Sequence, residues 1–130
     1  MRRYANTELG FRLLREPSVR PALVRILGDR VPLLERNLEL SNSVDVIAGS
    51  LAVSGIAPHH GGEDEAIVCI VTYDLSVHAA ILSGRTIEVF TPSASYTNVP
   101  LCIKDWITQV NSGHRDRLGP PANVRIVTSH

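Results

Sequence analysis

The sequence has few of the residues that mark several common classes of protein. Two of its 130 residues are cysteine, and aromatic residues make up 5% of the chain. Two cysteines do not make the disulfide framework of a small secreted domain. So few aromatic rings offer no stacking surface for single-stranded nucleic acid. No apolar run approaches the roughly 18 residues that a membrane helix needs, so we expect no membrane partner.

Lysine is scarcer still. Lys104 is the only lysine in the sequence, and the other basic residues are arginine. Catalysis by a Schiff-base or general-base lysine would therefore have to use that residue. The 13 basic residues balance 13 acidic ones, so the formal net charge is zero at pH 7. Proteins that bind nucleic acid usually carry a surplus of Lys and Arg, and we do not expect nucleic acid as a partner.

The balanced charge is unevenly distributed along the chain. Residues 1–40 carry eight basic residues against five acidic ones (+3), residues 41–100 one against six (−5), and residues 101–130 four against two (+2). Regions of opposite charge favour contact with a complementary partner. Folding of the basic segment onto the acidic one would cancel the asymmetry within the molecule, and this is the preferred interpretation.

The length and composition are those of one globular domain. A chain of 130 residues, 44% of them hydrophobic, has the commonest single-domain size and can bury a core without metal or disulfide staples. We therefore expect a single α+β domain over residues 1–130. Residues 1–6 carry charges but no apolar stretch follows them, so no secretion signal is evident. A cytoplasmic location is the simplest expectation.

Cys69 and Cys102 are expected to be buried free thiols. Each lies inside an apolar run, where a thiol behaves as a small hydrophobic group. A single bridge between them is the alternative.

The first forty residues have the pattern of short helices separated by proline. Pro17 ends a first helix, Gly28 supplies the C-terminal stop of a second, and Pro32 begins a third. This region is the expected helical N-terminal part of the fold.

Residues 44–55 fit two interpretations. Their apolar residues follow the spacing of one helix face, at Val44, Ile47, Ala48, Leu51, Ala52 and Gly55. Gly49 and several β-branched residues favour a pair of short strands instead. Helix is the preferred prediction, so residues 1–57 are expected to be mainly helical.

The rest of the chain predicts a sheet and a helix. In residues 66–91 the apolar residues follow the two-residue period of strands, in three runs separated by turns. This pattern predicts a three-stranded antiparallel meander ending in a β-hairpin. Residues 99–112 have the apolar spacing of a helix, and residues 123–128 are the candidate for an edge strand. Helices followed by strands predict an α+β fold with an antiparallel sheet, in which residues 66–128 form the sheet and its helix.

The densest group of potential metal ligands lies between Pro58 and Glu65, where His59 and His60 precede three carboxylates. Imidazole and carboxylate groups together could hold zinc or manganese. Adjacent residues in a Gly-Gly loop do not readily direct two donors at one tetrahedral ion. A solvated loop is the preferred interpretation, and we expect neither a metal nor a cofactor.

Asp74, Ser76 and His78 contain the three residue types of a nucleophilic triad. Side chains at i and i+2 of a strand lie about 7 Å apart, too far for direct proton transfer. The G-x-S-x-G turn that exposes a serine nucleophile is absent from the sequence. Asp74 and His78 remain the candidate catalytic residues, but a turn and a half-buried histidine are the preferred interpretation.

The predicted function is therefore a non-enzymatic protein-binding module: a chaperone, an immunity or inhibitor protein, or an oligomeric adaptor. Helices with weak apolar faces often dock on another protein or on a second copy, so a protein partner or a homodimer is expected. The candidate partner-binding residues are Arg12, Arg15, Arg20 and Arg25.

The alternative is a small enzyme or a ligand-binding domain. Its pocket would lie between the 66–91 sheet and the 99–112 helix and would use Tyr73, Asp74, His78 or Cys69.

Overall fold

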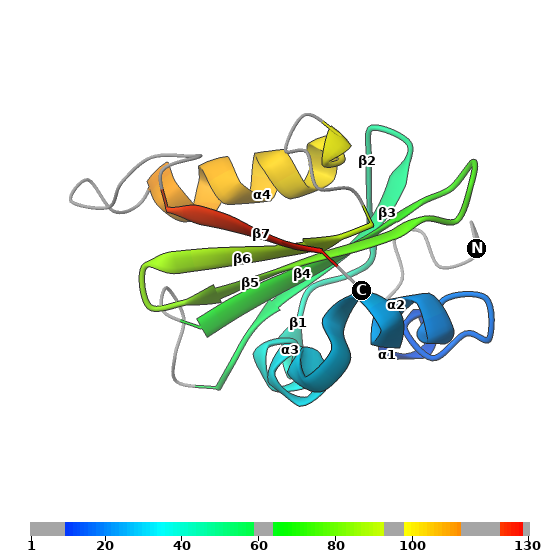
Figure 1. The fold of residues 1–130 in the computed structure, drawn as a ribbon, viewed down its shortest axis with the longest axis horizontal. Helices are drawn as coiled ribbons and strands as arrows, with labels where there is room; N and C mark the ends of the chain where they lie inside the picture. The colour runs from blue at the N-terminus through cyan, green and yellow to red at the C-terminus, as the bar shows by residue number, and fades with distance from the viewer. Residues whose placement is uncertain (1–9, 59–63, 93–97, 113–122, 129–130) are drawn as a thin grey trace.

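The computed structural model describes residues 10–58, 64–92, 98–112 and 123–128. They form three layers, in which a β-sheet lies between one long helix and a group of short helices (Figure 1). The helices are α1 (Gly10–Leu13), α2 (Arg20–Leu27), η2 (Gly28–Arg30), α3 (Val31–Asn37) and α4 (Leu101–Ser112). The strands are β1 (Leu40–Ser41), β2 (Asp45–Ile47), β3 (Ser50–Ile56), β4 (Asp64–Val71), β5 (Val77–Ser83), β6 (Thr86–Thr91) and β7 (Val124–Thr128). The α+β class expected from the sequence is confirmed.

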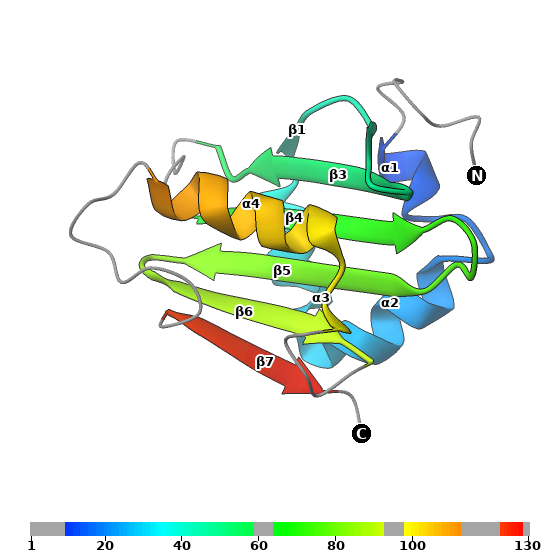
Figure 2. The same ribbon diagram turned by 90° about the horizontal axis from the view of Figure 1, so that it is seen from above.

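The sheet is larger than the predicted meander. Its strand order is β1-β3-β4-β5-β6-β7, and β2 also pairs with β3. The predicted meander is β4, β5 and β6 at the centre, with antiparallel pairing throughout. The predicted edge strand is β7, which pairs with β6 in parallel. In the sequence α4 comes between β6 and β7, and it crosses over the sheet (Figure 2). This crossover allows β7 to run parallel to β6. The sheet is thus mixed, where an antiparallel one was expected.

The helical region follows the proline and glycine signals. Pro21 lies in the first turn of α2, and Gly28 ends this helix with a φ of 56° and donates its N–H to the carbonyl of Val24. Only glycine adopts this conformation without a steric cost. Pro32 similarly lies in the first turn of α3. The first predicted helix corresponds to α1, which ends at Leu13, before Pro17.

The helix predicted over residues 44–55 is wrong. The segment forms β2 and β3, joined by a turn in which Ala48 and Gly49 have φ angles of 50° and 79°. Two successive positive φ angles are typical of the tightest hairpin turns. Pairing of β3 with β4 over its whole length satisfies the backbone and buries Leu51 and Val53 on one face and Ala52 on the other. Burial on two faces therefore outweighs a one-sided helical pattern, and the mainly helical part ends before Leu40.

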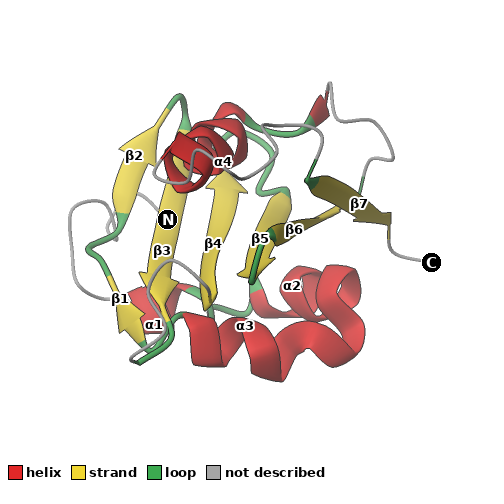
Figure 3. Cartoon of the chain, turned by 90° about the vertical axis from the view of Figure 1, so that its left-hand side faces the viewer, coloured by secondary structure: helices red, strands yellow, loops and turns green. Residues whose placement is uncertain are grey.

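Two apolar cores lie on opposite faces of the sheet. In β4, Val68 and Ile70 pack in the core that contains α1, α2 and α3, whereas Ile67 and Cys69 pack in the core that contains α4. Figure 3 shows α4 on one side of the sheet and the short helices on the other. The nearly continuous apolar sequence of β4 follows from this coverage on both faces.

A disulfide joins Cys69 of β4 to Cys102 of α4 across a sequence separation of 33 residues. The prediction of free thiols is therefore wrong. Cys69 points towards α4 and Cys102 lies on the buried side of that helix, so the Cα atoms are 6.5 Å apart, within the range that a disulfide spans. The two apolar runs face each other in space, which the sequence alone did not reveal.

Candidate functional site

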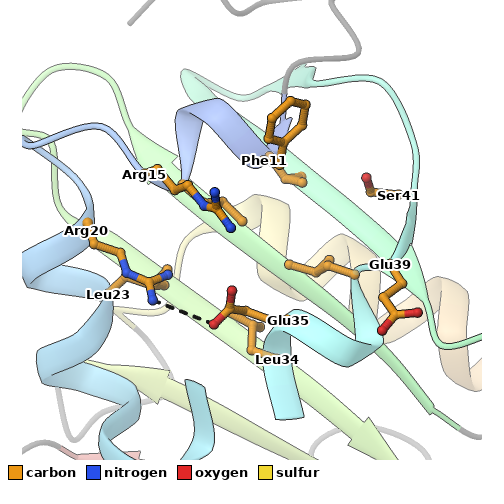
Figure 4. Close-up of a pocket in the computed structure, with 11 residues that line it drawn as sticks. Phe11, Arg15, Arg20, Leu23, Leu34, Glu35, Glu39 and Ser41 are labelled. Atoms are coloured by element: carbon orange, nitrogen blue, oxygen red, sulfur yellow. Dashed lines mark ion pairs between the residues drawn. The ribbon is translucent and has the colours of Figure 1, made fainter. Parts of the chain in front are cut away.

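A groove of about 360 Å³ opens on the helical side of the molecule, between the short helices and β3 (Figure 4). Its floor is formed by buried apolar side chains from all of these elements: Leu14, Leu23, Leu34, Leu38 and Val53. A groove with an apolar floor and a few polar groups at its rim has the general character of a binding site.

The rim of the groove carries charges of both signs. Arg15 and Arg20 lie on one side, and Glu35 and Glu39 come from α3 and the residues that follow it (Figure 4). Arg20 Nη2 lies 3.6 Å from Glu35 Oε1, and both side chains are partly exposed. An ion pair this exposed contributes about 1 kcal/mol or less to the stability of the fold. Phe11 stands at the edge with 57% of its surface exposed.

The structure brings together two of the four predicted partner-binding arginines. Arg15 and Arg20 share the groove rim. The Arg12 guanidinium lies 5.9 Å from the centre of the Phe11 ring, a cation–π contact. Arg25, in the last turn of α2, is exposed and does not line the groove.

A second cavity, of about 380 Å³, lies at the end of the sheet near the start of α4. His78 is one of its lining residues. Its Nδ1 lies 2.8 Å from Thr91 Oγ1 and its Nε2 lies 3.1 Å from Ser76 Oγ. The expectation that Ser76 is too far from His78 is wrong, because Ser76 precedes β5 and belongs to the turn that folds back over the strand. Burial lowers the pKa of His78, and the charge of Asp74 opposes this shift.

This network lacks the arrangement of a nucleophilic triad. Asp74 Oδ1 accepts a hydrogen bond from the Ser76 backbone N–H at 2.9 Å, and this bond lowers the Asp74 pKa. The imidazole Nδ1 is hydrogen-bonded to the hydroxyl of Thr91 and not to a carboxylate. Cys69, the other candidate nucleophile, is held in the disulfide. The contacts instead fix the β4–β5 turn against β6.

The space expected between the sheet and the 99–112 helix is filled by side chains over the central strands. Two hollows, of about 420 Å³ and 240 Å³, remain between α4 and the β1–β3 side of the sheet. Val99, Ile103, Trp106 and Ile107 of the α4 region pack directly on the sheet. The cavity beside His78 lies at the open end of this interface. Trp106 is therefore a core residue.

Two further expectations concern metal and membrane. His59 and His60 lie outside the described residues, so their placement stays untested. Among the residues that are described, no three His, Cys, Asp or Glu side chains gather as metal ligands would. Within the same residues, no helix is long and apolar enough to span a bilayer.

The fold and these surfaces define a small α+β protein that presents a charged, partly apolar groove and no assembled triad among its described residues. The family described as inhibitor of vertebrate lysozyme (Ivy) matches residues 18–113. The chain therefore belongs to this family, and it is a protein-binding inhibitor that has a protein partner. No curated protein and no solved structure matches the chain.

The matched residues begin just before α2 and run through β6 and α4, whereas α1 and β7 lie outside. The residue patterns predicted a protein-binding function but not the groove, because the groove depends on how the short helices pack beside β3. Glu35 lies in α3 and Glu39 just after it, and their four-residue spacing is the sequence signal that both lie on one side.

Proposed function

We propose that this protein binds a vertebrate lysozyme and blocks its active-site cleft. The observation that carries the proposal is the family match over residues 18–113. Lysozymes cleave glycosidic bonds with two carboxyl groups that flank the bond within a cleft. An inhibitor that occupies this cleft excludes the polysaccharide without carrying out any reaction.

The shape of the surfaces indicates which part of the inhibitor would enter the cleft. The groove beside Arg15 and Arg20 is concave, and a concave surface does not insert into another. The connections between strands are better suited. Two of them are two-residue turns, at Ala48-Gly49 and Gly84-Arg85. The connection between β3 and β4, residues 57–63, is longer.

The β3–β4 connection also carries suitable chemistry. It contains His59 and His60, and imidazole N–H groups donate hydrogen bonds to carboxylates. Its two ends are fixed by the sheet, since Ile56 pairs with Glu65 and the Ala57 N–H donates to the Asp64 carbonyl at 2.9 Å. Binding residues are often carried on loops held by a rigid scaffold, so this connection is the proposed inhibitory segment.

The test is inhibition of cell-wall lysis by a purified vertebrate lysozyme, with affinity measured by calorimetry. We expect stoichiometric inhibition by the intact protein. The double variant His59→Ala/His60→Ala should bind at least about tenfold more weakly, since one lost charge-assisted hydrogen bond corresponds to about that factor. Val24→Ala, at an exposed residue of α2, is the control and should inhibit normally. Absence of any lysozyme binding by the intact protein would refute the proposal.

A chaperone or an oligomeric adaptor, the other two kinds of binding module expected from the sequence, has no specific support in the described residues. The inhibitor interpretation is the one that the family match favours.

The cytoplasmic location expected from the sequence stays a prediction, and the disulfide argues against it. Cytosolic thiol reductants keep most cysteines reduced, whereas disulfides persist in secreted and periplasmic proteins. A bridge between Cys69 and Cys102 therefore favours an oxidising compartment. Cell fractionation with alkylation of free thiols tests this: protein found in the cytosolic fraction with two reactive thiols would support the original expectation.

A further inference from the structure

We propose that the two hollows between α4 and the β1–β3 side of the sheet form one trough, and that this trough takes a basic side chain of the protein partner. It is a second contact surface, separate from the β3–β4 connection and from the groove on the opposite face. The proposal rests on the proposed function, because it adds a contact to the complex with lysozyme.

The two hollows are continuous with each other. Four residues line both of them: Asn42, Ser54, Trp106 and Gln109. One wall of the trough is α4, and the other is β3 with the short strands β1 and β2, which Figure 3 shows at this edge of the sheet. The trough therefore offers one continuous concave surface to a partner.

The trough ends beside the proposed inhibitory segment. Ile56 and Glu65 line its larger hollow, and these two residues pair with each other at the base of the β3–β4 connection. A partner held by this connection has the trough directly beside it. This continuity favours the same partner as the occupant.

The floor of the trough is apolar and buried. Trp106 and Ile67 line the smaller hollow, and 6% and 2% of their surfaces are exposed. The stem of an arginine or a lysine can lie along such a floor while its charged end stays at the rim in water. At about 240 Å³, this hollow is smaller than the pockets that hold drug-sized ligands, so its size fits a single side chain.

The rim of the trough is acidic. Asp45 and Asp105 line the smaller hollow and Glu65 lines the larger one, whereas none of the described residues that line either hollow is basic. Asp45 Oδ1 accepts the backbone N–H of Val46 at 3.0 Å. Within the part of the chain that the structure describes, neither Asp45 nor Asp105 has an ion pair. An acidic rim above an apolar floor is complementary to a basic side chain.

A basic side chain fits this rim better than a metal ion does. Calcium and magnesium need several oxygen ligands at once, but no three ligand side chains gather among the described residues. The carboxylates are instead distributed over β2, β4 and α4. Arginine carries five N–H donors on a long stem and is enriched in protein interfaces, so it is the best match for separate acceptors.

The first experiment removes charge from the rim. The double variant Asp45→Asn/Asp105→Asn keeps the size of both side chains. Its affinity for a purified vertebrate lysozyme, measured by calorimetry, should be at least about tenfold lower than that of the intact protein. The affinity should also depend less on salt concentration, because attractions that salt screens are lost. Asp29→Asn, at an exposed residue of η2, is the matched control and should bind normally.

The second experiment fills the trough with a basic side chain of the chain itself. Gln109 is exposed and lines both hollows. Gln109→Arg places a guanidinium group beside the acidic rim, so the affinity for lysozyme should fall at least about tenfold. Thr108→Arg adds the same charge at a neighbouring exposed residue that lines neither hollow and should leave the affinity unchanged.

The outcomes distinguish this proposal from inhibition itself. If the intact protein binds lysozyme and either Asp45→Asn/Asp105→Asn or Gln109→Arg binds it equally well, the trough is not a contact surface and the proposed function still stands. If the intact protein binds no lysozyme, both proposals are refuted. Thermal unfolding is measured for every variant. A double variant that loses stability but not affinity would show that the rim serves the fold, which also overturns the proposal.

Discussion

The two faces of the sheet are covered in different ways. On one face a single helix of 12 residues, α4, packs along the strands and is linked to β4 by a disulfide. On the other face α1, α2 and α3 have 4, 8 and 7 residues and leave a groove between them. The first face, called the closed face below, is filled over the central strands and is hollowed beside β1–β3 and beside His78. The second face is hollowed by the groove with its apolar floor.

This difference follows from the lengths of the helices. A continuous helix presents one apolar stripe that matches the sheet, so little surface is left unfilled. The short helices are separated near Pro17 and at Gly28, and they leave part of this face uncovered at the groove. The residues they leave exposed, such as Phe11 and Arg15, are available for contact with another chain. We expect substitutions of buried residues on the closed face to lower stability, and those of exposed residues at the groove to change it little.

The largest effect should come from removal of the disulfide. A bridge that closes 33 residues of sequence restricts the unfolded chain, and the chain-entropy relation assigns it roughly 4 kcal/mol. Cys69→Ala/Cys102→Ala should lower the free energy of unfolding by about this amount in denaturant titrations. The intact protein measured in reducing agent is the control and should match the double variant. Equal stability with and without reductant would show that the closed face does not depend on this bond.

A sharper comparison uses one apolar residue from each face. Ile103 of α4 is fully buried, whereas Phe11 is largely exposed. Ile103→Ala should cost about 3 kcal/mol, because deletion of buried methyl groups leaves a cavity. Phe11→Ala should change the stability of the monomer by less than about 0.5 kcal/mol. Both values come from urea unfolding at a protein concentration where the chain is monomeric. Comparable losses would mean that the groove face is as tightly packed as the α4 face.

The β2–β3 turn tests how the edge of the sheet is built. Gly49 has a φ of 79°, and a Cβ added there would meet no atom within 4 Å. Gly49→Ala should therefore lower stability by about 1 kcal/mol through backbone strain alone. If the segment formed the helix that its spacing predicts, the same change would raise stability by about 1 kcal/mol. Thermal unfolding gives the sign directly, and Ala48→Gly, at a φ of 50°, should not destabilise.

Much of the fold could be predicted from local signals. Pro21 and Gly28 set the bounds of α2, and the period-two pattern after Asp64 marked the central strands. The failure at residues 44–55 has a physical cause: Val44, Ile47 and Leu51 are compatible with a helix, and only the pairing of β3 with β4 decides against it. Such pairing joins residues far apart in the sequence, so the twelve residues 44–55 alone do not indicate it.

The sites were harder to predict because they depend on approach in space. Cys69 and Cys102 lie in separate apolar runs, and the crossing of α4 over β4 makes them partners. Ser76 reaches His78 because the turn leaves the extended conformation. The sequence predicts four arginines as partner-binding residues without distinguishing among them. Only the folded structure places two of them, Arg15 and Arg20, at the rim of the groove.

The smallest effect should be a loss of stability in mild acid that originates at the open end of the α4 face. Burial lowers the pKa of His78 below its ordinary value of 6.5, so below that pH the unfolded chain binds a proton that the folded chain resists. Stability then falls as the pH decreases from about 6.5, and the fall ends below the folded pKa.

His78→Gln should reduce the dependence of the melting temperature on pH over this range. Asp74→Asn should steepen it, because the Asp74 charge favours the protonated imidazole. The fall due to Asp74 itself belongs to pH values below 3.8, so the two contributions separate in one pH series. If the melting temperature of His78→Gln depends on pH as that of the intact protein does, another group causes the acid sensitivity. His78 would then not contribute to the pH dependence of stability at this end of the α4 face.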